Sequence, residues 1–249
     1  MKAKILGKLE HDEGKLTWTP SAATGTELIL STAVFPPKRP FTIGCSGVPG
    51  SGKTTFARAL STEIRIRGLT PSVEYVDEYA RAYIAKYGPV TDLWEQIRIY
   101  NKQLQAERKF YGTCSTLVCD SPVFMGFMYS TYLQKRHVQK DSMLMADLFN
   151  EMIKLNTSPH YDVIFHLPPI LSPTEDGVRK VENFDSEWRE QSDSFIRTIF
   201  KLFPPVHYVV LDDTVQVAPE QSMRSALLNY RLNTACNLLA KFMEQKAVE

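Results

Sequence analysis

The sequence of 249 residues lacks the features of a secreted or membrane protein. Its four cysteines show neither a CxxC pair nor a histidine partner at metal-ligand spacing, so we expect reduced core thiols. No stretch approaches the roughly 18 consecutive apolar residues that a transmembrane helix needs. Residues 1–15, MKAKILGKLEHDEGK, contain no apolar core of a secretory signal. We therefore expect a cytoplasmic protein without membrane contact.

Neither sign of charge dominates the chain, since 29 Lys and Arg residues balance 28 Asp and Glu residues. Proteins that bind nucleic acid or acidic membranes over a broad surface usually carry a clear positive excess. A hydrophobic content of 43% with 23% charged residues is ordinary for a soluble globular protein. The composition argues against a general affinity for polyanions. It does not exclude a local basic groove.

Apolar runs and helical patterns alternate from residue 40 onward. The strand-like runs are 41–47, 72–78, 115–120, 161–167 and 204–213, and the helical patterns are 54–68, 78–88, 91–112, 122–136, 141–156 and 219–246. Such alternation is typical of a parallel sheet with helices on both faces. We predict an α/β three-layer sandwich around a mostly parallel five-stranded sheet, in a domain that spans residues 41–249.

The segment 1–40 does not share this rhythm, and we interpret it as an N-terminal β extension, either a hairpin or an edge strand. Its apolar strand-like run extends from Glu27 to Phe35. The following PPKRP, residues 36–40, is typical of a stiff connector. We expect its Lys38 and Arg39 to be solvated.

A glycine-rich loop joins the first strand of the main domain to its first helix. The run GVPGSGKT, residues 47–54, fits the pattern G-x-x-x-x-G-K-[ST]. Glycines let successive backbone N–H groups turn toward a phosphate, and the helix N-terminus adds its dipole. In this pattern the lysine contacts the β- and γ-phosphates and the hydroxyl ligates Mg²⁺. The sequence predicts that ATP and Mg²⁺ bind at Gly47, Pro49, Gly50, Ser51, Gly52, Lys53, Thr54 and Thr55.

Acidic residues follow two of the predicted strands. Asp120 ends an apolar run, so we expect it beside the loop as a second Mg²⁺ ligand, which is compatible with a role as helix N-cap. Asp77 and Glu78 end another strand, where ligands of open α/β sheets bind. One of the two is expected to accept the proton of an acceptor hydroxyl, and the sequence does not decide which. Arg81, one helical turn further on, could bind a phosphate of the acceptor or pair with Glu78.

Two further segments are expected to complete the site. On the helix predicted at 91–112, Trp94, Gln96 and Tyr100 could stack on and hydrogen-bond a base, while core packing is the competing interpretation for both aromatic residues. The polar segment near 172–190 is expected to be a lid whose Arg179 brings a cation to the transferring phosphate. An ordinary charged surface loop is the alternative.

The order of these motifs resembles the NadR-like P-loop ATPases and kinases, of which the ribosylnicotinamide kinase domain is the best-known member. The likeness covers roughly residues 40 to 215 and rests on GVPGSGKTT, VDEYARAYI, LVCDSP, YDVIFHLPPI and DGVR. The resemblance implies a P-loop kinase-like fold, ATP and Mg²⁺. It also implies an acceptor near Asp77, Glu78 and Asp120, and a lid arginine at Arg179.

We therefore predict a kinase that moves the γ-phosphate of ATP to a hydroxyl of a nucleoside-like or nucleotide small molecule. Two alternatives stay open. A nucleic-acid kinase would phosphorylate a 5′-hydroxyl or a hydroxymethylated base of DNA, with the basic segment 133–140 along the backbone. A P-loop ATPase would act with a protein partner. Related nucleoside kinases often have an arginine where Ser121 and Pro122 stand, so the sequence does not identify the acceptor. It also does not decide whether the protein forms a homodimer.

Overall fold

The computed structural model describes residues 7–12, 15–20, 38–137, 150, 160–169, 186–202, 204–212 and 222–248. The chain divides into two units, Met1–Lys38 and Arg39–Glu249. Among the described residues, no helix has both the length and the apolar character that a bilayer crossing requires.

The first unit contains a two-stranded antiparallel sheet, made of β1 (Gly7–Asp12) and β2 (Lys15–Pro20). The strand-like run expected at residues 27–35 lies outside the described residues. The sequence pattern predicted no strand at β1 or β2. The alternation of Leu16 and Trp18 with threonines was the available signal, and it is short, since Lys15 precedes it and Pro20 ends it.

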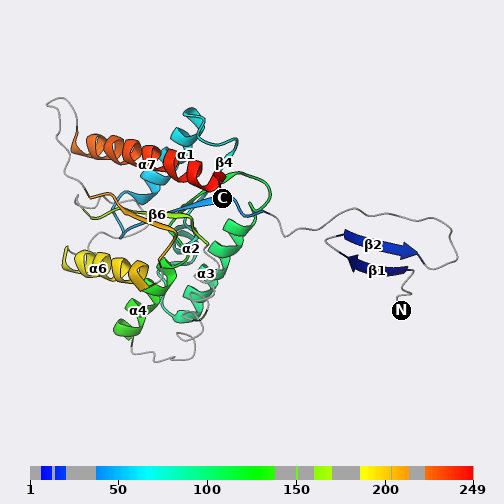
Figure 1. Ribbon diagram of the computed structural model, residues 1–249. Coiled ribbons are helices and arrows are strands. Elements are labelled where there is room, and N and C mark those ends of the chain that lie inside the picture. The colour runs from blue at the N-terminus through cyan, green and yellow to red at the C-terminus, as the bar shows by residue number, and fades with distance from the viewer. Residues whose placement is uncertain are drawn as a thin grey trace. The chain divides into compact units, whose positions relative to one another are not determined.

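The second unit is built on five parallel strands in the order β4-β5-β3-β6-β7 (Figure 1). Their bounds are β3 (Phe41–Ser46), β4 (Val73–Val76), β5 (Thr116–Asp120), β6 (Val163–His166) and β7 (His207–Val210). The chain first adds strands on one side of the central β3 and then on the other. The carboxyl end of β3 is therefore the topological switch point, where open α/β sheets bind ligands. The prediction of a five-stranded parallel sheet is confirmed.

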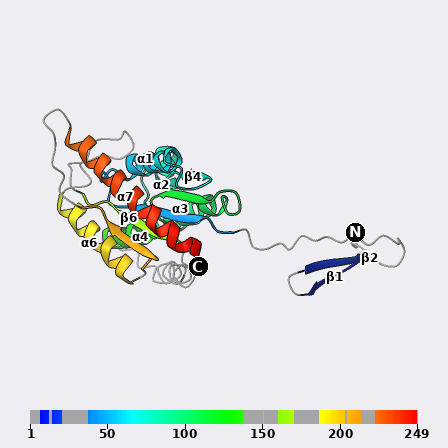
Figure 2. The same cartoon turned by 45° about the horizontal axis from the view of Figure 1, so that its top comes forward.

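Helices cover both faces of this sheet (Figures 1 and 2). Their bounds are α1 (Lys53–Ile66), α2 (Tyr79–Tyr87), α3 (Leu93–Arg108), α4 (Met125–His137), α6 (Ser186–Leu202) and α7 (Met223–Val248). Side chains of β5 alternate between two apolar clusters: Val118 joins α1 and α7, whereas Leu117 and Cys119 join α3, α4 and α6. The three-layer architecture is thus confirmed. The helix predicted at 141–156 lies, apart from residue 150, outside the described residues.

The start of α3 is set by a local capping interaction. The Asp92 side chain accepts a hydrogen bond from the backbone N–H of Glu95 at 2.8 Å, which satisfies one of the free donors of the first turn. From this start, four buried polar side chains recur on one helical face at spacings of four, three and four: Gln96, Tyr100, Gln103 and Glu107. Gln96, Tyr100 and Gln103 of this face lie beside Ser121, the residue that follows the carboxyl end of β5.

Arg39 anchors the amino end of the sheet. Its guanidinium forms two hydrogen bonds of 2.8 Å with the carboxylate of Asp162 and a third of 3.0 Å with the His160 carbonyl. Asp162 also accepts the N–H of Thr42 at 2.7 Å. The expectation that Arg39 is solvated is wrong, because its partner lies 123 positions away and only the fold brings it close. Lys38 is exposed, as expected.

We expect Arg39→Met to lower the free energy of unfolding by about 2 kcal/mol, because the Asp162 carboxylate stays buried and loses its charged partner. Urea denaturation measures this change. Lys38→Met is the matched control, and its effect should stay below about 0.5 kcal/mol. Equal losses in the two variants would contradict the importance of the ion pair.

Candidate active site

The glycine-rich loop lies at the carboxyl end of β3 and runs into α1. Gly47 has φ 146°, and a Cβ there would lie 2.5 Å from the Leu167 carbonyl oxygen, so no larger residue fits. Gly52, the N-cap of α1, has φ 90° in the left-handed region. These conformations turn the backbone N–H groups of the loop and of the first helical turn toward one point. The structure therefore provides the strand, loop and helix context that the motif requires.

Two cations flank this loop. Lys53 is 5% exposed, and its Nζ lies 3.5 Å from the Val48 carbonyl oxygen, so the side chain folds back over the loop. The Arg81 guanidinium of α2 lies 3.5 Å from the Thr54 hydroxyl. Both cations act to lower the pKa of Asp120, which places all of them around one small volume. The structure thus brings together Lys53, Thr54, Arg81 and Asp120.

Asp120 is a buried carboxylate at the carboxyl end of β5. It is 1% exposed and lies opposite Cys45 in the parallel pairing of β3 and β5. One carboxylate oxygen accepts the Tyr75 hydroxyl at 3.4 Å, while Oδ1 has no hydrogen-bond partner among the described residues. Burial raises the pKa of Asp120, and the neighbouring Glu78 raises it further. A cation near Oδ1 would offset the cost of burying this charge.

These features fit a magnesium ion. Mg²⁺ is held in nucleotide sites by one or two protein oxygens together with phosphate oxygens. The Thr54 hydroxyl and the Asp120 carboxylate supply two such oxygens beside the loop. No cluster of three or more His, Cys, Asp or Glu side chains suited to a metal occurs in the described part of the chain. A site that shares its ion with a nucleotide is the kind that these residues can form.

The structure separates the two acids that follow β4. The Asp77 side chain is 66% exposed and pairs with Arg58 at 2.7 Å on the surface. Glu78 is 4% exposed and lies close enough to Asp120 to affect its titration. Only Glu78 of the two lines a cavity in the described structure.

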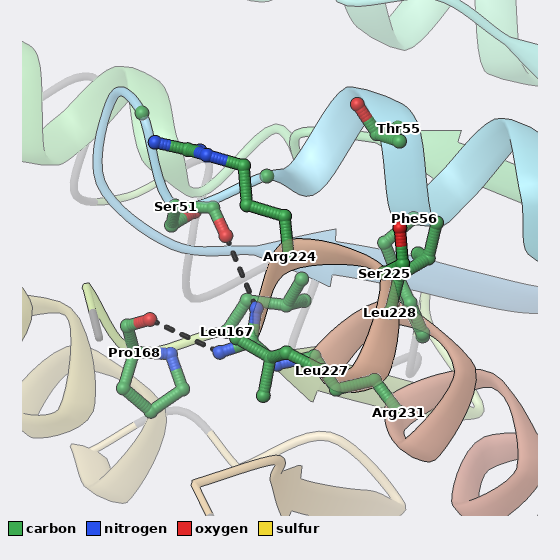
Figure 3. Close-up of a pocket in the computed structure, with 12 residues that line it drawn as sticks. Ser51, Thr55, Phe56, Leu167, Pro168, Arg224, Ser225, Leu227, Leu228 and Arg231 are labelled. Carbon is green, nitrogen blue, oxygen red and sulfur yellow. Dashed lines mark hydrogen bonds between the residues drawn. The ribbon is translucent and has the colours of Figure 1, made fainter. Parts of the chain in front are cut away.

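A cavity of about 280 Å³ lies between the loop and the start of α7 (Figure 3). Ser51, Thr55 and Phe56 line it on one side, and Arg224 and Leu228 on the other. In Figure 3 the Arg224 side chain extends toward the loop that carries Ser51. The cavity is therefore continuous with the predicted phosphate site.

Arg231 of α7 forms the floor of this cavity and was assigned no role from the sequence. It is 4% exposed and donates to the backbone carbonyls of Ser51 at 3.1 Å and Pro168 at 3.2 Å (Figure 3). It also donates to the Leu211 carbonyl at 3.2 Å. Burial lowers its pKa to about 10. This single side chain ties the loop to the segments after β6 and β7. The available signal was an arginine within an apolar helical pattern that also contains Arg224.

A second, smaller cavity of about 30 Å³ lies on the other side of the site, between α3 and α4. Its lining consists of Glu78, Ala80, Gln96, Ile99, Tyr100, Gln103, Ser121, Pro122, Val123, Met125, Gly126 and Tyr129. Gln96 and Tyr100, which the sequence assigned to substrate binding, line this cavity, and Tyr100 also packs in the apolar core, which was its competing interpretation. Trp94 is 65% exposed and lies neither in this lining nor in the core.

Ser121 shapes this second cavity through its backbone. It has φ 72°, a left-handed conformation that is uncommon for residues other than glycine and costs on the order of 1 kcal/mol. Its N–H donates to the Cys45 carbonyl at 3.1 Å, which extends the β3–β5 pairing by one step. The chain then turns sharply, so Pro122 and Val123 join the cavity wall. The Ser121-Pro122 pair favours a turn, but the left-handed conformation of Ser121 is not marked in the sequence, because no glycine stands there.

The expected lid falls largely outside the described residues. Arg179 and the rest of 170–185 belong to that part of the chain, and their proposed role stays a prediction. Residues 186–190 form the first turns of α6.

A family model described as an AAA domain matches residues 42–216, from β3 to the segment after β7. Solved structures share the fold. A NadR protein in complex with NR gives a TM-score of 0.58 at 18% identity, covering 77% of this chain and 50% of that one. A thymidylate kinase from Ehrlichia chaffeensis gives 0.53 at 18% identity, covering 80% and 98%.

The chain spans about half the length of the NadR chains that it matches, since a NadR protein in complex with NAD and AMP-PNP is covered to 49%. No curated protein matches the sequence. At these identities the structural likeness shows the fold. The resemblance to NadR-like P-loop proteins that the motifs indicated is confirmed at that level.

We expect Asp120→Asn to stabilise the ligand-free protein by on the order of 1 kcal/mol and to remove the Mg²⁺-dependent part of ATP binding. The folded-state pKa of Asp120 lies above its unfolded value, so the carboxyl favours folding when protonated. This advantage is lost as pH rises through the folded pKa. Asparagine carries no charge, so the difference between variant and parent should grow with pH above about 4.

Thermal unfolding over a pH series, with calorimetry of ATP binding with and without Mg²⁺, measures both effects. Asp77→Asn is the control for an exposed carboxylate and should change neither. A variant that is less stable at neutral pH and still binds ATP in a Mg²⁺-dependent manner would refute this account of Asp120.

Proposed function

The chain belongs to the AAA-domain family, and from this premise we propose that it is a kinase that transfers the γ-phosphate of ATP to a hydroxyl of a nucleoside. One observation carries the proposal. The phosphate loop and the buried carboxylates Asp120 and Glu78 meet at one edge of the sheet, with a cavity on each side of them. A phosphoryl donor and a separate acceptor can therefore meet at these residues.

The donor side of this site suits ATP. A triphosphate in the loop would be contacted by backbone N–H groups and by Lys53. Its base would then lie in the cavity between α1 and α7, against Thr55 and Leu228. Arg231 donates a hydrogen bond to the Ser51 carbonyl and so fixes the position of the loop relative to this cavity.

Thr54 and Asp120 are the residues that would hold Mg²⁺ on this side. The bound ion supplies positive charge that neutralises the oxygens of the phosphates during transfer. Lys53 and Arg81 add charge of the same sign from the protein itself. Because these groups are buried or partly buried, their interaction with phosphate is screened less than at an open surface.

On the acceptor side we assign the proton-accepting role to Glu78. A general base must lie within hydrogen-bond reach of the hydroxyl that it deprotonates. Glu78 lines the acceptor cavity and is close to Asp120, whereas Asp77 pairs with Arg58 at the surface. An acceptor hydroxyl between Glu78 and the loop is in position for in-line attack.

The lining of the acceptor cavity favours a nucleoside over a nucleotide. In the described structure it contains one carboxylate, Glu78, and neither lysine nor arginine. A phosphate dianion would be repelled there, whereas a neutral or positively charged nucleoside would not. At about 30 Å³ this cavity has room for an acceptor hydroxyl but not for a whole nucleoside, so binding of the base would require the side chains around Gln96 and Tyr100 to move apart. Nicotinamide riboside, which the sequence resemblance suggests, has a positively charged base of this kind.

A transfer assay with labelled ATP and Mg²⁺ tests the proposal. Nicotinamide riboside, a nucleoside panel, a nucleotide panel, and single- and double-stranded DNA serve as acceptors. We expect label on a nucleoside, with Lys53→Ala lowering transfer at least about a hundredfold because one phosphate contact is lost. Label on DNA, or phosphate release without a labelled product, would overturn the proposal in favour of a nucleic-acid kinase or an ATPase.

We expect Glu78→Gln to retain ATP binding and to lower kcat by roughly 10²–10⁴, the usual contribution of a general base. Asp77→Asn is the matched control, since Asp77 is exposed and paired with Arg58, and its kcat should stay within about threefold of the parent. Steady-state kinetics and ATP calorimetry measure both. If Asp77→Asn is the slow variant, the roles of the two acids are reversed.

A further inference from the structure

A buried carboxylate stands behind the acceptor cavity and takes no part in the proposed chemistry. Glu107, in the last turn of α3, is 0% exposed. One of its oxygens is hydrogen-bonded to His160 Nε2 at 2.7 Å and accepts the Tyr161 hydroxyl at 2.9 Å. The other accepts the side-chain amide of Gln103 at 3.0 Å. A group so fully bonded is expected to hold its neighbours in one orientation.

The first path from Glu107 leads to the proton-accepting residue. Gln103 lines the acceptor cavity and gives its amide N–H to Glu107. Its Oε1 accepts the backbone N–H of Tyr79 at 2.8 Å, directly after Glu78. Because both ends of the amide are bonded, Gln103 cannot turn over without losing a bond. The position of the chain at Glu78 therefore depends on Glu107.

The second path leads to the opposite wall of the cavity. The Tyr161 hydroxyl donates to Glu107 and accepts the backbone N–H of Val123 at 2.8 Å. Val123 lines the cavity two residues after the left-handed turn at Ser121. The direction of the Tyr161 hydroxyl is fixed by its two partners. The position of this wall thus depends on the same carboxylate.

We propose that Glu107 is a positioning residue of the acceptor site, which holds Glu78 and the Ser121–Val123 turn at a fixed separation through Gln103 and Tyr161. This inference rests on the proposed function for its kinetic consequence. Glu107 itself does not line the cavity, so it acts through these neighbours and has no direct contact with an acceptor.

The role requires a carboxylate, because a carboxylate accepts hydrogen bonds at both oxygens and donates none. A glutamine at this place must direct its NH₂ group either at Gln103 or at the His160–Tyr161 pair. In the first case its NH₂ group meets the NH₂ group of Gln103, and in the second it meets the donors of His160 and Tyr161. Both cases place a donor against a donor, unless the neighbouring side chain changes its own orientation or protonation. Reversal of Gln103 would turn its own NH₂ group toward the Tyr79 N–H. The substitution therefore disturbs at least one path.

Amide hydrogen exchange of the full chain tests the positioning directly. In Glu107→Gln we expect the amides of Tyr79 and Val123 to exchange about tenfold faster, as expected when one hydrogen bond is lost. The amide of Thr116, bonded to the Ser72 carbonyl at 3.0 Å, is the internal reference and should not change. Uniform acceleration of all three amides would show general destabilisation and overturn the proposal.

A charge-swapped variant keeps the test decisive even if the single variant folds poorly. In Gln103→Glu/Glu107→Gln, the carboxylate now stands at position 103 and the amide at position 107. The carboxylate accepts the Tyr79 N–H and the NH₂ group of the new amide. The oxygen of that amide faces His160 and Tyr161. Both paths are then complete with one bond reversed. We expect exchange at Tyr79 and Val123 to return to within about threefold of the parent. Failure of this rescue would contradict the two-path arrangement.

Asp193→Asn is the matched control, because Asp193 is also a buried carboxylate bonded to a histidine. It lies 2.8 Å from His166 Nε2 and accepts Arg197 at 2.8 Å, on α6, away from the acceptor cavity. Loss of this pair should leave exchange at Tyr79 and Val123 at the parent rate. Acceleration there to the extent seen in Glu107→Gln would mean that any buried pair has this effect.

Kinetics with nicotinamide riboside, adenosine and thymidine as probe acceptors complete the experiment. For a probe that the parent phosphorylates, Glu107→Gln should raise the acceptor KM about tenfold and leave the ATP KM unchanged. An unchanged acceptor KM in a variant with faster exchange would overturn the positioning role. If the parent phosphorylates no probe, the proposed function fails, while the exchange data still decide whether Glu107 holds both walls.

Discussion

The parallel pairing of β3 with β5 is the interaction on which the site depends. It sets Cys45 opposite Asp120, so that the carboxylate emerges beside the phosphate loop that follows β3. The same ladder continues through the N–H of Ser121 and then breaks in a left-handed turn. That turn carries Pro122 and Val123 into the wall of the acceptor cavity. A shift of one residue in this register would direct the carboxylate to the other face of the sheet and lose both features.

Burial of charge without a full set of partners is the second constraint. The pKa of Asp120 is raised and that of Arg231 is lowered to about 10, in both cases chiefly by loss of water. Both groups therefore reduce the stability of the ligand-free fold. Two apolar clusters, one on each face of the sheet, offset this cost. Sites in which charges are already desolvated interact strongly with a nucleotide and its ion.

The division of the core into two clusters also divides the substrates. The donor cavity is bounded by α1 and α7, and its Phe56 belongs to the cluster on that face. The acceptor cavity is bounded by α3 and α4, and its Tyr100 and Met125 belong to the other cluster. Each proposed substrate is thus held by one helical layer, and the two would meet at the edge of the sheet between the layers.

The phosphate loop, the acidic residues at the ends of two strands and the α/β class could be predicted from the sequence. Each of them depends on residues that are adjacent or periodic along the chain. The burial of Glu78 rather than Asp77, the exposure of Trp94 and the ion pair of Arg39 depended on tertiary structure. So did the role of Arg231, whose bond to Ser51 spans 180 positions. Burial and partner choice are properties of segments that meet only in the folded chain, and no local pattern encodes which of two neighbouring acids becomes enclosed.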